Sequence, residues 1–240
     1  EEQGFGFDLD VFAASLSDKT RLVILNSPSN PTGGVLHQDQ IAAIARMLAD
    51  RPRVMVLSDE IYSRMLYVGR HHSIATEPGM QERTLILDGF SKTYAMTGWR
   101  LGYGVMPEWL AQAVTQLQIN ATSCVNAATQ MAGIEALRGP QTDVDHMVEA
   151  FLGRRDRIVA GLNAIPGIRC VLPEGAFYAF PNVSDLGVSE QVLADGLLQD
   201  AGVAVLPGTA YLRLSYANSV ANIDRALERM ADHVARLRGR

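Results

Sequence analysis

Residues 84–104 read Thr-Leu-Ile-Leu-Asp-Gly-Phe-Ser-Lys-Thr-Tyr-Ala-Met-Thr-Gly-Trp-Arg-Leu-Gly-Tyr-Gly, and this stretch decides the fold that we predict. Its first four residues form an apolar run, which predicts a short buried strand. Four glycines between positions 89 and 104 then permit turns and close approaches of the backbone. Lys92 is therefore expected directly after the carboxyl end of a buried strand.

Two apolar runs upstream of this stretch predict further strands. They cover residues 21–25 and 54–57, and apolar residues at helical spacing between them predict a helix over residues 37–50. Nearly continuous apolar strands joined through a helix are typical of a parallel sheet covered by helices on both faces. The sequence therefore predicts an α/β fold with a mostly parallel sheet and flanking helices. A short helix at residues 7–16 and a fourth strand at residues 101–106 complete this part.

The second half of the chain has an α+β pattern. A long amphipathic helix over residues 143–165 ends at Pro166-Gly167 and is predicted to connect two domains. We therefore expect a partial large domain at residues 1–142 and a smaller carboxyl-terminal domain at residues 143–240. The other elements are predicted as helices at residues 108–120, 126–138, 189–201 and 222–238, and as strands at residues 168–171, 176–180, 203–206 and 211–215.

The composition of the chain argues against several classes of function. A formal net charge of -5, from 21 Lys and Arg against 26 Asp and Glu, does not favour binding to nucleic acid. Cys124 and Cys170 lie far apart in the sequence, which indicates neither a disulfide framework nor a zinc site. No apolar run has the length of a membrane span and the acidic start is unlike a signal peptide, so we expect a cytoplasmic protein without a membrane partner. The missing initiator methionine leads us to expect a piece of a longer chain.

Polar side chains follow three successive predicted strands. In open α/β sheets, ligands bind outside the carboxyl ends of the strands. These strands lead to Asn30, to Asp59 with Tyr62, and to Lys92. Each residue alone has an ordinary structural explanation, as a turn asparagine, a helix N-cap aspartate, a surface tyrosine or a solvated loop lysine. Their coincidence at one sheet edge favours a ligand site.

Pyridoxal phosphate is a ligand that gives each of these side chains a task. Lys92 supplies the primary amine for a Schiff base and can then carry protons. Asp59 pairs with the pyridine nitrogen and keeps it protonated, which makes the ring an electron sink. Tyr62 and Asn30 can donate hydrogen bonds to the phenolic oxygen.

Three more side chains extend this predicted site. Arg100 and Ser91 are assigned to the cofactor phosphate. Arg213 lies inside an apolar strand pattern, where a charge is costly without an anionic partner, and its planar fork suits the carboxylate of an amino acid. We assign no metal to the chain, and we expect the His71-His72 pair to be solvated in a loop.

Four motifs in this order resemble the class I/II, fold type I aminotransferases, in particular the aspartate and aromatic branch. They cover residues 26–33, 59–62, 91–103 and 213–215, and the resemblance extends over essentially the whole chain. It implies a homodimer with a large cofactor-binding domain, a small mobile domain and an active site at the dimer interface. It also implies transfer of an amino group from an amino acid to a 2-oxo acid, with Asn30 and Arg213 binding the substrate.

The chain departs from the family pattern in three places. Members of the family carry further strands, a phosphate-binding loop and a ring-stacking aromatic residue upstream of where this sequence begins. A phosphate-binding serine often stands where this chain has Gly89, and a longer glycine-rich loop stands where it has only Ala210. We therefore expect weak or no cofactor binding from the 240 residues alone.

Two other functions fit the same motifs. The first keeps the cofactor but changes the reaction, to that of a β-elimination lyase or a cyclopropane-forming synthase. The second is the ligand-sensing half of a transcription regulator that fuses an aminotransferase-like domain to a DNA-binding domain. The sequence Thr-Gly-Trp-Arg at residues 97–100 and the presence of Arg213 favour an amino-acid transaminase over these two alternatives.

Overall fold

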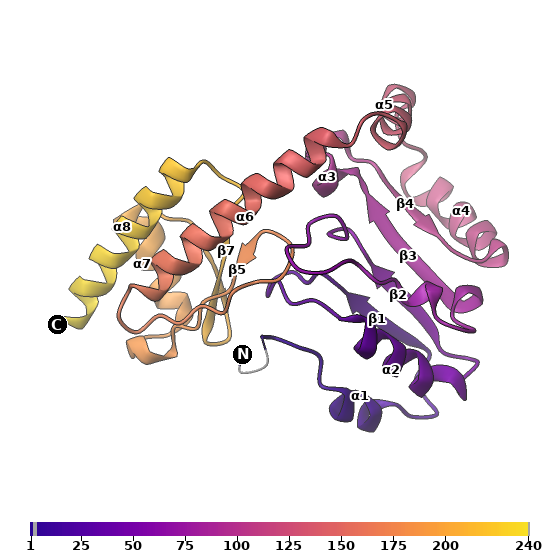
Figure 1. Ribbon diagram of the computed structural model, residues 1–240, viewed down its shortest axis with the longest axis horizontal. Helices are drawn as coiled ribbons and strands as arrows, with labels where there is room; N and C mark the ends of the chain where they lie inside the picture. The colour runs from indigo at the N-terminus through magenta and orange to yellow at the C-terminus, as the bar shows by residue number, and fades with distance from the viewer. Residues whose placement is uncertain (2–3, 240) are drawn as a thin grey trace. The chain divides into compact units, whose positions relative to one another are not determined.

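The computed structural model describes residue 1 and residues 4–239, which form two compact units (Figure 1). The first, called the sheet unit here, contains residues 6–28 and 35–145. The second, the carboxyl-terminal unit, contains the described residues of 1–5, 29–34 and 146–240. The short segment 29–34 thus leaves the sheet unit and returns to it.

A four-stranded sheet with the order β1-β2-β3-β4 forms the centre of the sheet unit. The first three strands are parallel, and β4 runs antiparallel to β3, so the predicted mostly parallel sheet is confirmed. Asn26 lies opposite Asp59, and Asp59 lies opposite Leu87, which places three strand ends at one edge. The strands are β1 (Leu22–Asn26), β2 (Met55–Asp59), β3 (Thr84–Gly89) and β4 (Gly102–Val105).

The helix α2 (Gln38–Ala49) covers one face of this sheet (Figure 1). Its residues Ile41, Ile44 and Leu48 recur at helical spacing and are buried against apolar side chains of β1 and β2. Side chains of α1 (Leu9–Ser15) and its flanks pack on the same core. Burial of these apolar side chains stabilises the sheet unit.

The opposite face of the sheet is open in the described residues. Leu22 and Ile24 alternate with the buried Val23 and Leu25, and Ile24 is 66% exposed. Leu87 on β3, which lies on the same face as Ile24, is 37% exposed. The predicted flanking helices are present, but in the described residues the side chains of Leu22 and Ile24 on this face stay exposed.

The remaining helices of the sheet unit follow the strands. A Cβ atom added to Gly133 of α5 would meet Leu101 at 2.5 Å and Phe90 at 3.2 Å, so α5 packs closely on the stretch after β3. None of the residues in α4 is buried. The elements are η1 (Ile74–Thr76), η2 (Gln81–Arg83), α3 (Phe90–Thr93), η3 (Thr97–Trp99), α4 (Glu108–Thr122) and α5 (Ala127–Arg138).

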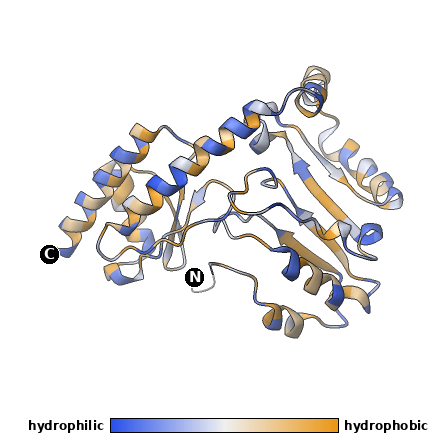
Figure 2. Cartoon of the chain, in the orientation of Figure 1, coloured by the Kyte–Doolittle hydropathy of each residue, from blue (hydrophilic) through white to orange (hydrophobic). Residues whose placement is uncertain are grey.

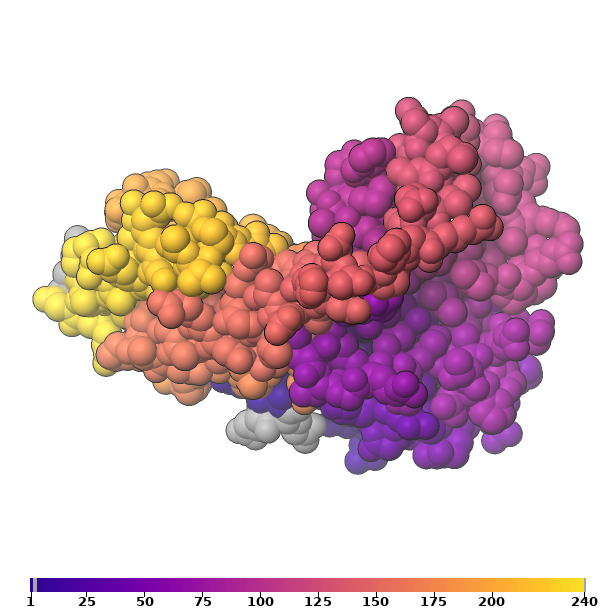
Figure 3. All heavy atoms as spheres, turned by 45° about the horizontal axis from the view of Figure 1, so that its top comes forward, coloured from indigo at the N-terminus to yellow at the C-terminus, as the bar shows by residue number. Residues whose placement is uncertain are grey.

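The carboxyl-terminal unit combines a three-stranded antiparallel sheet of order β5-β7-β6 with helices. Gly196 of α7 lies against the ring of His233 in α8, which is how the two helices pack closely. Hydrophilic and hydrophobic residues alternate along α8 (Figure 2), and one face of this helix is open to solvent (Figure 3). The elements are α6 (Thr142–Asn163), which begins in the sheet unit, β5 (Tyr178–Ala179), η4 (Ser184–Leu186), α7 (Glu190–Ala201), β6 (Leu206–Gly208), β7 (Tyr211–Ser215) and α8 (Val220–Arg238).

Two predicted strands of this unit are wrong or displaced. Residues 168–171 form only one bridge, between Arg169 and Asn182. The strand expected at 203–206 begins at Leu206, since the Val203 amide donates back to the carbonyl of Leu197 and ends α7. The strand expected at 176–180 is shortened to β5.

None of the helices formed by the described residues combines the length with the apolar character that crossing a membrane requires.

Candidate functional site

Asp59, Tyr62 and Lys92 come together at the carboxyl edge of the sheet. Asp59 is the last residue of β2, and Lys92 lies in the short helix α3 directly after β3. The Lys92 amine lies over the ring of Tyr62, 5.9 Å from its centroid. The expected grouping of these three residues at neighbouring strand ends is therefore present in the structure.

Backbone hydrogen bonds determine the course of the chain after β2. The Glu60 amide donates to the carbonyl of Leu87 at 2.8 Å, which continues the pairing with β3 for one residue. The Ile61 amide then donates to the Asp59 carboxylate at 3.3 Å and closes a tight turn. Tyr62 is buried by this turn and is only 3% exposed, rather than lying on the surface.

Close packing of backbone determines the course of the chain after β3. A Cβ atom at Gly89 would lie 2.9 Å from the Cα atom of Gly102, so β3 and β4 approach to a distance that a side chain would prevent. Phe90 is buried, while Ser91 and Lys92 on the next positions of α3 are half-buried. The amine and the hydroxyl thus remain reachable at the strand end.

Arg100 lies in a different environment from Lys92. It adopts the left-handed conformation, with φ 54°, and its guanidinium donates to the carbonyl of Thr97 at 3.0 Å. It lines a hollow of about 700 Å³ together with Trp99 and residues between positions 118 and 129. The lining of this hollow includes neither Ser91 nor Lys92, so the predicted phosphate pair stays a prediction.

A buried carboxylate that the sequence did not assign lies next to Asp59. Glu60 accepts hydrogen bonds from Ser58 at 2.9 Å, from Ser73 at 2.6 Å and from the Nε2 atom of His71 at 2.8 Å. Burial alone would raise the pKa of Glu60, but these hydrogen bonds and the His71 charge outweigh burial and lower it. The expectation that His71 is a solvated loop residue is therefore wrong.

A second carboxylate lies at the end of β3. Asp88 accepts hydrogen bonds from the Gly89 amide at 2.6 Å and from the Tyr103 hydroxyl at 3.1 Å. Burial raises the pKa of Asp88, and the charge of Glu60 raises it further. Burial and the Asp88 charge raise the pKa of Tyr103 to about 12. Tyr103 therefore stays protonated and serves as a donor at neutral pH.

Asn30 and Arg213 lie together in the carboxyl-terminal unit. The Arg213 guanidinium donates to the Oδ1 atom of Asn30 at 3.0 Å, and its carbon lies 5.0 Å from the centroid of the Tyr178 ring. Arg213 is half-buried on β7, between the buried Leu212 and Leu214. A half-buried guanidinium held by an amide and an aromatic ring is oriented to bind a carboxylate.

The segment 29–34 that carries Asn30 is fixed at Gly33. Its carbonyl accepts hydrogen bonds from the amides of Glu174 at 3.0 Å and Gly175 at 2.9 Å. Gly33 has a φ of +71°, and a Cβ atom there would meet the Cβ atom of Pro173 at 2.3 Å. Both the conformation and the space therefore require glycine.

We expect Gly33→Ala to destabilise the carboxyl-terminal unit more than Gly187→Ala does. Both glycines have a φ of +71°, but a Cβ atom at Gly187 meets nothing within 4 Å. The conformation costs each variant about 1 kcal/mol, and the clash with Pro173 adds about 1–3 kcal/mol. Urea unfolding followed by circular dichroism measures the difference, and equal free energies of unfolding for the two variants would contradict the close contact.

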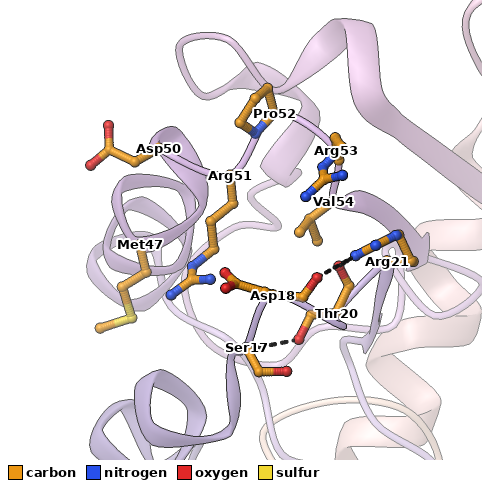
Figure 4. A pocket seen from close by; sticks show the side chains of 10 residues that line it. All are labelled: Ser17, Asp18, Thr20, Arg21, Met47, Asp50, Arg51, Pro52, Arg53 and Val54. Carbon is orange, nitrogen blue, oxygen red and sulfur yellow. Dashed lines mark hydrogen bonds between the residues drawn. The ribbon is translucent and has the colours of Figure 1, made fainter.

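The opposite edge of the sheet, where β1 and β2 begin, carries another hollow, of about 420 Å³ (Figure 4). Arg51 points toward Asp18 across it, while Arg21 donates to the backbone carbonyls of Asp18 and Thr20. Acidic and basic side chains are mixed in its lining, and none of the predicted site residues belongs to it. The predicted site residues Asp59 and Lys92 lie instead at the carboxyl edge of the sheet.

The residues at the carboxyl edge fit pyridoxal phosphate. Lys92 supplies a reachable amine beside the Tyr62 ring, and Asp59 is a half-buried carboxylate one strand away. An aldehyde cofactor with a basic ring nitrogen needs these two groups, a primary amine and a carboxylate. The donor set therefore matches the cofactor that the sequence predicts.

The contacts of several residues near the predicted site were not predicted from the sequence. Glu60 is two positions after the buried Ser58, and this period-2 spacing on β2 could have placed its carboxylate on the covered face. The side chain of Asn26 at the end of β1 donates to the Asp59 carbonyl at 3.4 Å, a contact between strands that the sequence pattern does not indicate. The contacts of His71 and Tyr178 left no local signal, since their partners lie far away in the sequence.

Comparison with known proteins identifies the class of this fold and site. The family model for aminotransferase class I and II matches residues 1–230. The chain belongs to the class I and II aminotransferases, whose aspartate and aromatic members use pyridoxal phosphate.

Several curated relatives and solved structures are similar to the chain. It is 41% identical to an aspartate aminotransferase of Musicola paradisiaca over 231 residues, covering 92% of this chain and 58% of the relative. It is 37% identical to aromatic-amino-acid aminotransferase 2 of Thermococcus litoralis, covering 96% and 61%. The crystal structure of the aspartate aminotransferase from Rhizobium meliloti matches with a TM-score of 0.93 and 38% identity, over 98% of this chain and 64% of that chain.

A further structural neighbour is the aromatic aminotransferase from Pyrococcus horikoshii OT3. It matches with a TM-score of 0.93 and 36% identity, over 98% of this chain and 65% of that chain. The chain therefore spans about three fifths of the length of the relatives it matches.

Proposed function

We propose that the chain is part of an amino-acid transaminase that moves an amino group from an L-amino acid to a 2-oxo acid with pyridoxal phosphate. The observation that carries this proposal is the position of the Lys92 amine, 5.9 Å from the centroid of the Tyr62 ring and one strand from Asp59. Family membership supports it independently. The named relatives act on aspartate or on aromatic amino acids, and we propose these as the first donors to test.

The residues of the sheet unit are proposed to hold the cofactor and to move protons. Pyridoxal phosphate, when bound, supplies an aldehyde that captures amines and a ring that accepts electrons. Lys92 would hold the cofactor aldehyde and, once a substrate amine has displaced it, its free amine would carry the proton of the substrate's α-carbon. Asp59 holds a proton on the pyridine nitrogen, and Tyr62 donates to the phenolic oxygen. Arg100 and Ser91 are proposed to bind the phosphate.

The residues of the carboxyl-terminal unit are proposed to bind the substrate. Arg213 offers two parallel N–H groups to the α-carboxylate, and Asn30 keeps the guanidinium in its orientation through the bond of 3.0 Å. Asn30 is also proposed to donate to the phenolic oxygen of the cofactor. The division into a large domain at residues 1–142 and a small one at residues 143–240 is part of the same proposal.

Amino transfer by the full-length protein tests the proposal. A panel of aspartate, alanine and aromatic donors is incubated with 2-oxoglutarate and pyridoxal phosphate, and the new amino acid and 2-oxo acid are quantified. We expect equal amounts of both products from at least one donor. Release of ammonia without a new amino acid would instead support a lyase, and absence of any reaction with retained cofactor binding would support a sensor domain.

We expect Arg213→Lys to raise KM for the amino donor about tenfold and to change kcat much less. Lysine keeps the charge but loses the fork and the contact with the Tyr178 ring. Arg154 is also half-buried and lies 5.3 Å from the centroid of an aromatic ring, that of Phe151, so Arg154→Lys is the matched control. Steady-state kinetics measure both, and a similar rise of KM in the control would remove the assignment.

The proposal also includes a homodimer in the cytoplasm. The open sheet face with Leu22 and Ile24, and exposed apolar side chains on α4 such as Trp109 and Leu117, give the sheet unit a surface that apolar contacts would stabilise. Size-exclusion chromatography with light scattering on the full-length protein measures the number of subunits. A monomer that retains full activity would contradict this part.

A further inference from the structure

The buried Glu60 and its three donors form a polar cluster directly behind Asp59 and Tyr62. We call Glu60, Ser58, His71 and Ser73 the Glu60 network. Glu60 is 6% exposed, and carboxylates are rarely buried without partners. The cost of burying this charge indicates that the network has a specific task in the folded protein.

The strand geometry shows what the network holds. Side chains alternate between the faces of a strand, so Val56, Ser58 and Glu60 point to the covered face, while Leu57 and Asp59 point to the other. The buried side chain of Glu60 therefore fixes the backbone on the covered face of the sheet, one residue after Asp59. We call residues 58–65, which contain both Asp59 and Tyr62, the Asp59 corner.

The network joins the Asp59 corner to the loop that follows it in the sheet unit. Ser73 is the N-cap of η1, and His71 lies two residues before it, so both donors come from the loop that follows the corner. Because an ionised carboxylate only accepts hydrogen bonds, the Nε2 atom of His71 must carry the hydrogen. Glu60 thus binds two segments together with its two oxygens.

Within the Asp59 corner, backbone hydrogen bonds connect Glu60 to the turn that carries Tyr62. The Ser63 amide donates to the carbonyl of Glu60 at 2.8 Å, and the Met65 amide donates to the carbonyl of Tyr62 at 2.8 Å. The turn that carries Tyr62 is therefore built on the backbone of Glu60. A shift of the Glu60 side chain would displace both Asp59 and Tyr62, on which the proposed chemistry depends.

We propose that Glu60, held by His71, Ser73 and Ser58, is a positioning residue that sets the places of Asp59 and Tyr62 toward the pyridine ring of the cofactor. This inference rests on the proposed function, because it assigns the network to the same site. The titratable groups around Glu60 are Asp88 on β3, the Tyr103 hydroxyl on β4 and His71. The charge of Glu60 is one of the causes that raise the pKa of Asp88.

The direction of the pH effect follows from these shifts. The pKa of Glu60 is lower in the folded protein than its ordinary value of 4.5, so its contribution to stability is present above that value and is lost as the pH falls through the folded pKa. Burial and the charge of Glu60 raise the pKa of Asp88, the neighbouring carboxyl group on β3. At neutral and mildly acid pH the Glu60 network is therefore intact.

The first test measures the Asp59 corner without the cofactor. We expect Glu60→Gln to increase the hydrogen-exchange rates of the Ile61, Ser63 and Met65 amides about tenfold, because glutamine places a donor against the donors of the network. Amides of β1 should exchange as in the wild type. Unchanged rates at all three corner amides would overturn the anchoring role, whether or not the protein binds pyridoxal phosphate.

A pair of adjacent histidines provides the matched variants. His71→Leu removes a donor to Glu60 and should increase the same rates, whereas His71→Gln, which restores an N–H donor, should return them most of the way. His72→Leu changes the neighbouring residue and should leave them unchanged. If Glu60→Gln fails to fold, the His71 series alone decides, and equal effects of His71→Leu and His72→Leu would overturn the proposal.

The second test measures the effect on the ring of the cofactor. Full-length protein is titrated with pH while the absorption of bound pyridoxal phosphate is recorded. Loosening Tyr62 weakens its donation to the phenolic oxygen, so Glu60→Gln and His71→Leu should raise the midpoint of the spectral change by about half a pH unit or more. A midpoint identical to that of the wild type would overturn the positioning role, whereas absence of any cofactor binding by the wild type would count against the proposed function instead.

Discussion

Replacing Lys92 by alanine should lower the rate of amino transfer about 1,000-fold or more, because the variant loses the amine proposed to carry the proton of the α-carbon. The same change should abolish the change in cofactor absorption that follows binding to an amine. The Lys92 amine lies 5.9 Å from the centroid of the Tyr62 ring, just beyond the end of β3, which is the position that the proposed role requires. Steady-state kinetics and absorption spectra of the full-length variant measure both effects.

The sequence offers a matched control for this experiment. Its 240 residues contain two lysines, and the other, Lys19, is exposed in the turn before β1. Lys19→Ala should keep the activity and the spectrum of the wild type. Reduction with borohydride fixes the cofactor to the amine that holds it, and mass spectrometry then identifies the peptide. Label on any residue other than Lys92 in the wild type would contradict the assignment.

The elements that position Lys92 and Asp59 could be predicted because their information is local. Continuous apolar runs gave β1, β2 and β3 within two residues of their bounds, and the helical spacing of Ile41, Ile44 and Leu48 gave α2. The parallel order of these strands then places their carboxyl ends at one edge. A site at that edge follows from topology, before any side-chain contact is known.

The sequence-based predictions fail where contacts between residues far apart in the chain outweigh the local pattern of apolar residues. The apolar run at 203–206 looks like a strand, but Gly202 in the left-handed conformation lets the Val203 amide end α7 instead. His71 has no local feature that distinguishes it from His72, and its role depends on Glu60, eleven positions earlier. The exposure of Ile24 could not be predicted either, because a continuous apolar run does not tell which of the two faces of the strand a helix covers.

Asp59→Asn should lower kcat/KM by about 10- to 1,000-fold. An opposite charge within contact distance shifts a pKa by about 1–3 units, and each unit of lost stabilisation corresponds to a factor of ten in rate. Asparagine can still accept the hydrogen bond from the Ile61 amide, which measures 3.3 Å in the wild type. The variant therefore keeps the turn and removes the charge, and the loss should fall on kcat more than on cofactor binding.

A cofactor analogue separates charge from shape in this variant. Pyridoxal phosphate methylated on the pyridine nitrogen carries a permanent positive charge and needs no carboxylate to retain it. We expect the analogue to restore a large part of the activity of Asp59→Asn while giving no gain in Lys92→Ala, because the amine is still missing there. Equal responses of the two variants to the analogue would show that Asp59 acts on the shape of the site rather than on the protonation of the ring.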